Sequence, residues 1–160
     1  MTAPKGRESH IVGHPVALGD YRGSSVVLIF SGRDSTDQAR QISRAIRSRH
    51  DSERLPIISI LDLSGVPKML HGFAKGRIQG GYQELVRDVT AVMQQHGKQV
   101  PADLSRIIIM LPDWDGAVTA SYGLKGVEKQ TIAVAVDGDG NIRGYGSGPQ
   151  GGEQILAHFG

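Results

Sequence analysis

Cysteine is absent from all 160 residues of the chain. Its absence excludes disulfide bonds, thiolate nucleophiles, and the zinc or iron–sulfur centres that need cysteine ligands. Aromatic residues are scarce, at 5%, so the core must consist mainly of valine, isoleucine, leucine and alanine. Such a core is feasible because 39% of the residues are hydrophobic and 21% are charged, which is ordinary for a globular domain.

Long hydrophobic runs and a strong excess of one charge are missing as well. No stretch approaches the roughly 18 apolar residues of a membrane span, and residues 1–7 lack the apolar region of an export signal. Lys and Arg outnumber Asp and Glu by only 18 to 16, which does not indicate a nucleic-acid partner. We therefore expect a cytoplasmic protein with no membrane span, although an exported protein trimmed of its signal would look the same.

The hydrophobic pattern alternates between strands and helices. Three continuous apolar runs predict buried parallel strands, at residues 26–30, 57–61 and 107–111. Helical spacing predicts a helix that begins near residues 34–36 and a second, clearer one from Tyr82 to Met93 that Gly97 ends. Alternation of this kind favours a parallel sheet with helices on both faces.

The last third of the chain has a different pattern. Residues 131–136 and 142–145 predict two strands, and the Asp-Gly-Asp-Gly-Asn run between them is typical of a hairpin turn. Short helices are expected after Gly116 and after Pro149. The sequence thus predicts an α/β fold with a central mixed sheet and a C-terminal β-hairpin plus helix.

Two further segments complete this organisation. Residues 1–13 are expected to be a flexible N-terminal segment, and residues 14–160 a single domain. Residues 62–81 are rich in glycine and carry Lys68, Lys75 and Arg77 among apolar residues. We interpret this segment as a long loop that binds a partner.

Local motifs in this order resemble a known superfamily. Leu18-Gly19-Asp20-Tyr21-Arg22-Gly23 precedes the first buried strand, and Tyr122-Gly123-Leu124, the run from Asp137 to Ile142, and Gly146 follow in turn. Together they resemble the start and end of thioredoxin-like redoxins in their peroxiredoxin (AhpC/TSA-like) and TlpA-like forms, over residues 14–160. The resemblance implies a thioredoxin-like fold.

The same resemblance locates the thiol site of that family. Its nucleophilic cysteine follows the first buried strand, in the first turn of the helix, where the helix N-terminus stabilises a thiolate. Aligning Phe30 with the family's strand-end aromatic residue puts Ser35 at the nucleophile and Gln38 at the second cysteine. The residue before Thr131, a cis-proline in the family, is Gln130. Because both hallmarks are absent, the family's catalytic roles do not carry over.

The segment from Phe30 to Ser35 is also similar to the cysteine-free, YtfJ-like periplasmic branch, which implies shared lineage. If the former thiol site binds a ligand, its candidate residues are Arg33, Ser35, Thr36, Gln38 and Gln130. Arg33 and the free N–H groups of a helix start can hold a carboxylate, a phosphate or a partner's backbone. The alternative is that Asp34, Ser35 and Asp37 merely cap the helix.

Other polar clusters have a structural and a functional interpretation. Asp113 and Asp115 follow a strand and are interpreted as turn formers, with a site as the alternative. Arg40, Arg44 and Arg47 are interpreted as a solvated helix face, with contact to an acidic partner or phosphates as the alternative. The six histidines show no metal-ligand spacing, so we expect no metal or other cofactor.

Three functions remain open. The first is a non-catalytic redoxin-like domain, a pseudoenzyme without thiol redox activity, that binds a protein or small ligand at the former active-site face or at residues 62–81. The second is an enzyme with non-thiol chemistry near Arg33 and Ser35. The third is a homodimeric interaction module joined through a sheet edge.

Overall fold

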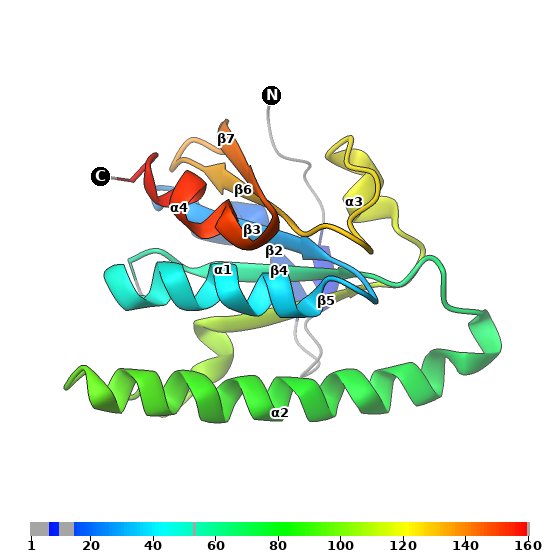
Figure 1. The fold of residues 1–160 in the computed structure, drawn as a ribbon, viewed down its shortest axis with the longest axis horizontal. Helices are drawn as coiled ribbons and strands as arrows, with labels where there is room; N and C mark the ends of the chain where they lie inside the picture. The colour runs from blue at the N-terminus through cyan, green and yellow to red at the C-terminus, as the bar shows by residue number, and fades with distance from the viewer. Residues whose placement is uncertain (1–6, 10–14, 53, 160) are drawn as a thin grey trace.

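The computed structural model describes residues 7–9, 15–52 and 54–159 (Figure 1). A five-stranded sheet forms the centre, in the order β5-β4-β3-β6-β7. Its strands are β3 (Val26–Ser31), β4 (Ile57–Asp62), β5 (Ile108–Asp113), β6 (Ile132–Val136) and β7 (Ile142–Ser147). The helices are α1 (Thr36–Arg49), α2 (His71–Gln95), α3 (Ala117–Ser121) and α4 (Gly151–Leu156).

Shorter elements connect or flank this framework. They are the strands β1 (Arg7–Ser9) and β2 (Pro15–Ala17), and the 3-10 helices η1 (Leu18–Tyr21), η2 (Lys68–Leu70), η3 (Leu104–Arg106) and η4 (Gly148–Gln150). β1 and β2 pair in antiparallel fashion, so residues 7–9 of the segment expected to be flexible form a strand. The remainder of that segment, residues 1–6 and 10–13, lies outside the described residues.

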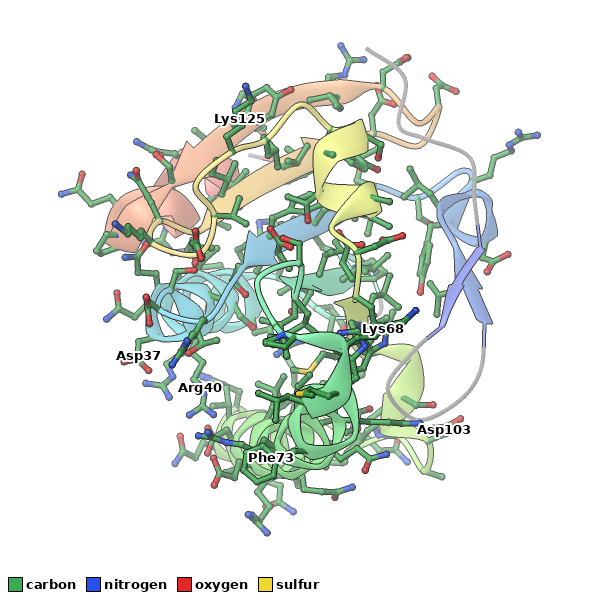
Figure 2. All side chains as sticks on the ribbon, turned by 90° about the vertical axis from the view of Figure 1, so that its right-hand side faces the viewer. Asp37, Arg40, Lys68, Phe73, Asp103 and Lys125 are labelled. Carbon is green, nitrogen blue, oxygen red and sulfur yellow. The ribbon has the colours of Figure 1, made fainter. Side chains whose placement is uncertain are left out.

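The sheet is mixed, as expected. β3 pairs in parallel with β4, and β4 with β5, whereas β6 is antiparallel to both β3 and β7. All six residues of the central strand β3 are buried, which explains its unbroken apolar run. The carboxyl ends of the three parallel strands lie at the right of Figure 1 and face the viewer in Figure 2.

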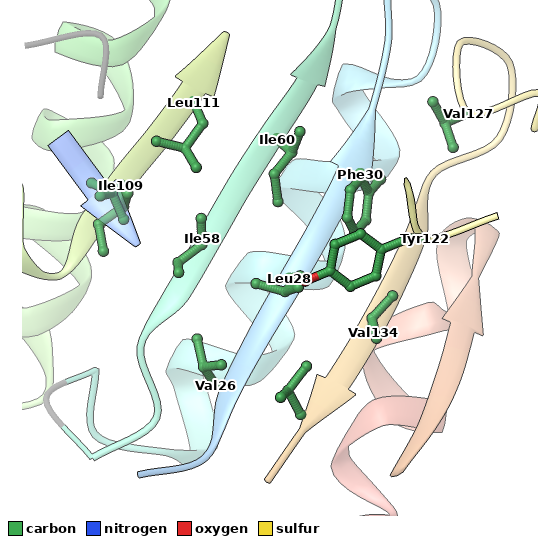
Figure 3. Packing of buried hydrophobic residues seen from close by; sticks show 12 residues of the cluster. Val26, Leu28, Phe30, Ile58, Ile60, Ile109, Leu111, Tyr122, Val127 and Val134 are labelled. Atoms are coloured by element: carbon green, nitrogen blue, oxygen red, sulfur yellow. The ribbon is translucent and has the colours of Figure 1, made fainter. Parts of the chain in front are cut away.

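Each face of the sheet has its own hydrophobic core. On one face, Leu28 and Phe30 pack with Ile58, Ile60 and residues near α3 and η1 (Figure 3). On the opposite face, residues of β3 pack against α1 and α4, and Ile108 of β5 packs against α2. The expected placement of helices on both faces is thus confirmed, with three of the four α-helices on one of them.

The interpretation of residues 62–81 as a loop is wrong for more than half of the segment. η2 occupies residues 68–70, and α2 begins at His71 and continues through four glycines. Helical structure persists because Ile78 and Tyr82 are buried against the sheet, and the Tyr82 hydroxyl donates a hydrogen bond to Ile108 O at 2.9 Å. Tertiary packing therefore outweighs the low helix propensity of glycine.

This helix assignment predicts that Gly80→Ala raises the free energy of unfolding by about 1 kcal/mol, because alanine is the better helix former. A Cβ at Gly80 would meet nothing within 4 Å. Urea denaturation would measure the change, with Gly152→Ala of α4 as the control. A Cβ at Gly152 would come within 2.8 Å of Ala45 Cβ, so that variant should lose stability. A destabilised Gly80→Ala variant would contradict a helix at this position.

None of the helices in the described part of the chain is both long and apolar enough to cross a membrane.

Candidate functional site

The topology brings the start of α1 beside the segment that leads into β6. Phe30, near the end of β3, pairs with Ile132, at the start of β6. The two loops that follow and precede these residues, 32–35 and 126–131, therefore meet at the carboxyl end of the sheet. The backbone N–H of Asp34 donates a hydrogen bond to Glu128 O at 2.9 Å, which joins them directly.

Ser35, at the position of the family's nucleophile, is completely buried. Its hydroxyl donates a hydrogen bond to Val127 O at 2.5 Å and accepts one from the Gly32 N–H at 3.1 Å. Both partners are backbone groups of the chain itself. The Ser35 hydroxyl therefore uses its hydrogen bonds to join the two loops.

The expectation that the Ser35 side chain caps α1 is wrong. Ser35 does occupy the N-cap position, and its carbonyl accepts the first helical hydrogen bond, from Ala39 N. Its side chain makes no capping hydrogen bond. The physical reason is that the hydroxyl points into the buried loop junction, where Val127 O has to be satisfied.

Gln38, at the position of the second cysteine, holds the backbone on both sides of Gln130. Its Oε1 accepts a hydrogen bond from Thr131 N at 3.0 Å, and its Nε2 donates one to Lys129 O at 3.3 Å. The Thr131 hydroxyl in turn donates to Ser35 O at 2.7 Å. None of the described peptide bonds is cis. The side chains of Gln38 in α1 and of Thr131, just before β6, thus reinforce the loop contact that Ser35 makes.

Gly32 allows the two loops to approach this closely. A Cβ built on Gly32 would lie 2.5 Å from Glu128 Cα, closer than real Cβ atoms come to a neighbouring backbone. The position therefore requires glycine for lack of space.

The other predicted site residues face solvent. Arg33, Thr36 and Gln130 are exposed around the junction, while Ser35 and Gln38 are engaged within it. The structure thus brings the five residues to one end of the sheet, but two of their side chains are occupied by backbone partners. Ligand binding by this set stays a prediction.

Ser35 has no general base beside it among the residues that the structure describes: its hydroxyl contacts two backbone groups, and a serine nucleophile needs a base within hydrogen-bond reach. The nearby core contains Tyr122, whose ring lies 5.0 Å from that of Phe30. Burial raises the pKa of the Tyr122 phenol, so it stays protonated at neutral pH. The geometry does not favour nucleophilic chemistry here.

Asp113 and Asp115 act as turn formers, as expected. The buried Asp113 carboxylate accepts hydrogen bonds from Val118 N at 3.2 Å and from Thr119 N and Oγ1, both at 2.8 Å. Asp115 Oδ1 accepts one from Ala117 N at 3.0 Å. These carboxylates satisfy the free N–H groups at the start of α3. Across the described residues, no group of three or more acidic or histidine side chains could hold a metal ion.

The interpretation of the three arginines of α1 as one solvated face is wrong for Arg47. Arg47 is buried beneath α2, because α2 packs beside α1 on the same face of the sheet. Arg44 is exposed, and Arg40 lies 3.4 Å from Glu84 of α2 in an exposed ion pair. Such exposed pairs contribute little, about 0–1 kcal/mol.

A cluster of exposed apolar side chains lies at η2 and the start of α2. Met69, Leu70 and Phe73 are 89%, 48% and 70% exposed, and we call these three residues the apolar patch. Figure 2 shows Phe73 pointing away from the sheet, on the same end of the molecule as Asp37 and Arg40 of α1. The mixture of apolar and basic residues is visible in the sequence. Its location on η2 and the start of α2 is visible only in the structure.

Contacts beneath the apolar patch hold η2 in place. The His71 ring packs against Trp114 in a tilted arrangement with centroids 4.5 Å apart, and His71 Nε2 lies 3.2 Å from Val66 O. Lys68, Lys75 and Arg77 lie close to the patch in the sequence, and all three side chains are exposed. The patch is therefore an exposed apolar surface on helical structure, with three exposed cations close to it in the sequence.

Several solved structures with a similar fold are named as thioredoxins or thiol-disulfide proteins. The pneumococcal exposed lipoprotein thioredoxin Etrx1 of Streptococcus pneumoniae aligns with 14% identity and a TM-score of 0.63, over 97% of this chain and 99% of that one. StoA of Bacillus subtilis aligns with 12% identity and a TM-score of 0.57, over 98% and 97%. The thioredoxin domain of a thiol-disulfide oxidoreductase from Bacteroides vulgatus gives 13% and 0.59, over 99% and 95%. The fold is thioredoxin-like, as the sequence motifs implied.

Sequence similarity to known proteins is limited to part of the chain. No family model matches the chain. Over 98 residues it is 31% identical to the 3-deoxy-manno-octulosonate cytidylyltransferase of Nitrosococcus oceani, and the match covers 59% of the chain. The chain spans only 36% of the length of that relative, which is a transferase by name.

Proposed function

We propose that this thioredoxin-like domain is a redox-inactive binding module whose protein partner docks on the apolar patch. The absence of cysteine fits the lack of thiol redox activity. The observation that carries the proposal is the exposure of Met69 and Leu70 on η2 and of Phe73 in the first turn of α2. We also propose the cytoplasm as its location, although one structural neighbour is described as an exposed lipoprotein.

Exposed large apolar side chains that cluster are typical of interaction surfaces. Burying them against a partner would contribute roughly 25 cal/mol for each Å² of apolar surface removed from water. His71, which directly follows η2, contacts Trp114, so the backbone that carries the patch is already ordered before a partner binds. The patch therefore meets the physical requirements of a binding site before any partner is present.

The border of the patch supports a partner of particular chemistry. Lys68, Lys75 and Arg77 are exposed and close to it in the sequence, and complementary charge near an apolar contact raises the association rate and selects among partners. The partner segment is therefore proposed to combine aromatic or aliphatic residues with Asp or Glu. The exposed Arg33, Thr36 and Gln130 lie at the same end of the molecule and are proposed to extend the contact.

The enzyme hypothesis receives less support from the geometry. The Ser35 hydroxyl, its central group, is buried and bonded to Val127 O and Gly32 N. A homodimer through the free edge of β7 remains an alternative, and it would place Tyr145 rather than the apolar patch at the interface.

Selection from a displayed peptide library tests the proposal. Wild-type protein is expected to enrich peptides that carry apolar residues beside carboxylates. Phe73→Ala should weaken their binding at least about tenfold, as for a central interface residue. Its stability should change by no more than about 0.5 kcal/mol, because Phe73 is exposed. Tyr145→Ala, which removes another exposed aromatic residue, is the matched control and should bind normally.

Three results would contradict the proposal. The first is a library that yields no enriched peptide. The second is a set of peptides that bind Phe73→Ala as well as wild type. The third is reduction of insulin disulfides or consumption of peroxide by the purified chain, since the proposal requires it to be inert in both assays.

A further inference from the structure

A second feature lies at the opposite end of the molecule, where α1 and α2 both end at the left of Figure 1. Arg47, in the last turn of α1, is only 9% exposed. Its Nη1 donates a hydrogen bond to Ser43 Oγ at 2.9 Å and its Nη2 one to Ile107 O at 3.4 Å. Its Nε is buried and has no hydrogen-bond partner in the part of the chain that the structure describes.

The charge on Arg47 is not balanced by a neighbour. No carboxylate forms an ion pair with Arg47 among the described residues; the pairs found there involve Arg40, Arg49 and Arg143. Burial lowers the pKa of the Arg47 guanidinium to about 10, so it is still protonated at neutral pH. A buried cation without a counter-charge is unfavourable unless an anion joins it.

A narrow pocket opens beside this guanidinium. It is lined by Arg47, Ser52, Val89, Val92, Met93, His96 and Lys98. The pocket has a volume of about 10 Å³, which holds one oxygen atom or one water molecule. His96 and Lys98 are exposed, so the outer part of the pocket is bordered by cationic or ionisable side chains.

Two carbonyl groups in the last turn of α2 accept hydrogen bonds from the chain itself. Val92 O accepts a hydrogen bond from His96 N at 3.2 Å, and Met93 O accepts one from Lys98 N at 2.8 Å. These carbonyls are therefore directed to the chain's own amides. The Nε–H of Arg47 has no acceptor among the described residues, and Lys98 adds a positive charge to the lining of the pocket.

We infer that this pocket binds a phosphate group. One phosphate oxygen would occupy the enclosed space beside Arg47 Nε, and the others would face Lys98 and His96 in the open part. Arginine suits this role because its N–H groups are fixed in a plane and pair strongly with oxyanions. The buried Ser52 lines the same pocket and can donate a further hydrogen bond. This site is independent of the apolar patch.

Thermal denaturation in inorganic phosphate, against chloride at equal ionic strength, tests the inference. The Tm of the wild type should rise with phosphate concentration, because a ligand that binds the folded state stabilises it. Arg47→Met should weaken the affinity at least about tenfold through loss of the charged donor. Arg44→Met, which removes an exposed arginine three residues earlier on the same helix, should leave it unchanged.

Lys98→Ala keeps the inference testable if Arg47→Met does not fold. Lys98 is exposed, so the variant should unfold like wild type in chloride and bind phosphate about threefold more weakly. In wild-type protein, NMR shift changes should concentrate at residues 47, 52 and 96–98. Methyl phosphate and a phosphoserine peptide, titrated in parallel, show whether a small ester or a modified protein fits the opening.

Equal Tm values in phosphate and chloride would overturn the inference and leave a water molecule as the occupant of the pocket. An equal loss of affinity in Arg44→Met and Arg47→Met would also overturn it, because general charge screening would then explain the effect. NMR shift changes confined to the start of α1 would place the bound phosphate at a different site. That result would also overturn the inference.

Discussion

Ser35→Ala is expected to lower the free energy of unfolding by about 2–4 kcal/mol, the largest effect of a single polar substitution near the former thiol site. The change leaves two buried groups without a partner, the Gly32 N–H and the Val127 carbonyl. Each unsatisfied buried group costs about 1–3 kcal/mol. Urea denaturation followed by circular dichroism would measure the loss.

Ser48→Ala is the matched control for this prediction. Ser48 lies on the same helix, is exposed, and donates a hydrogen bond to Ala45 O at 2.8 Å. Its replacement by alanine, a better helix former, should change stability by less than about 0.5 kcal/mol. If Ser35→Ala were as stable as wild type but failed to bind the selected peptides, Ser35 would act on a ligand, and the structural role derived from its contacts would be wrong.

Gly32→Ala is expected to cost about 3 kcal/mol, at the upper end of the usual range for overpacking. The new methyl group would lie 2.5 Å from Glu128 Cα, so the loops 32–35 and 126–131 would have to separate. That movement would also stretch the hydrogen bond from Asp34 N to Glu128 O. The same denaturation experiment would measure the effect.

Gly65→Ala provides the comparison. A Cβ on Gly65 would meet nothing within 4 Å, so this variant should be nearly as stable as wild type. Destabilisation of Gly65→Ala to the same extent would show that the loss in Gly32→Ala comes from backbone freedom rather than contact. Equal stability of Gly32→Ala and wild type would contradict the close approach of the two loops.

The contacts of Ser35 and Gln38 explain how a thioredoxin-like fold accommodates a site without thiols. Ser35 and Gln38 stand where the resemblance implies the two cysteines, and both side chains bond to the backbone that precedes β6. The polar groups that substitute for the cysteines thus stabilise the junction of two loops. The two binding sites that we propose lie elsewhere, at the apolar patch and at the Arg47 pocket.

Local sequence patterns determined much of the fold. The apolar runs at residues 26–30 and 57–61 became β3 and β4 with nearly the same bounds, because a strand buried on both faces needs no polar alternation. The β6–β7 hairpin followed from its glycine-rich turn, in which Gly140 has a φ of +84°. These features depend on interactions between residues close in the chain.

Tertiary structure decided the remaining features. The helix over residues 71–81 depends on burial of Ile78 and Tyr82 against β5, which glycine-rich sequence does not reveal. The partner of the Ser35 hydroxyl is 92 residues away, and a carbonyl partner of Arg47 is 60 residues away. The sequence alone established that the chain has no thiol chemistry, because composition does not depend on folding. Which polar groups are buried, paired or free depends on contacts between distant segments, and only the folded chain brings those segments together.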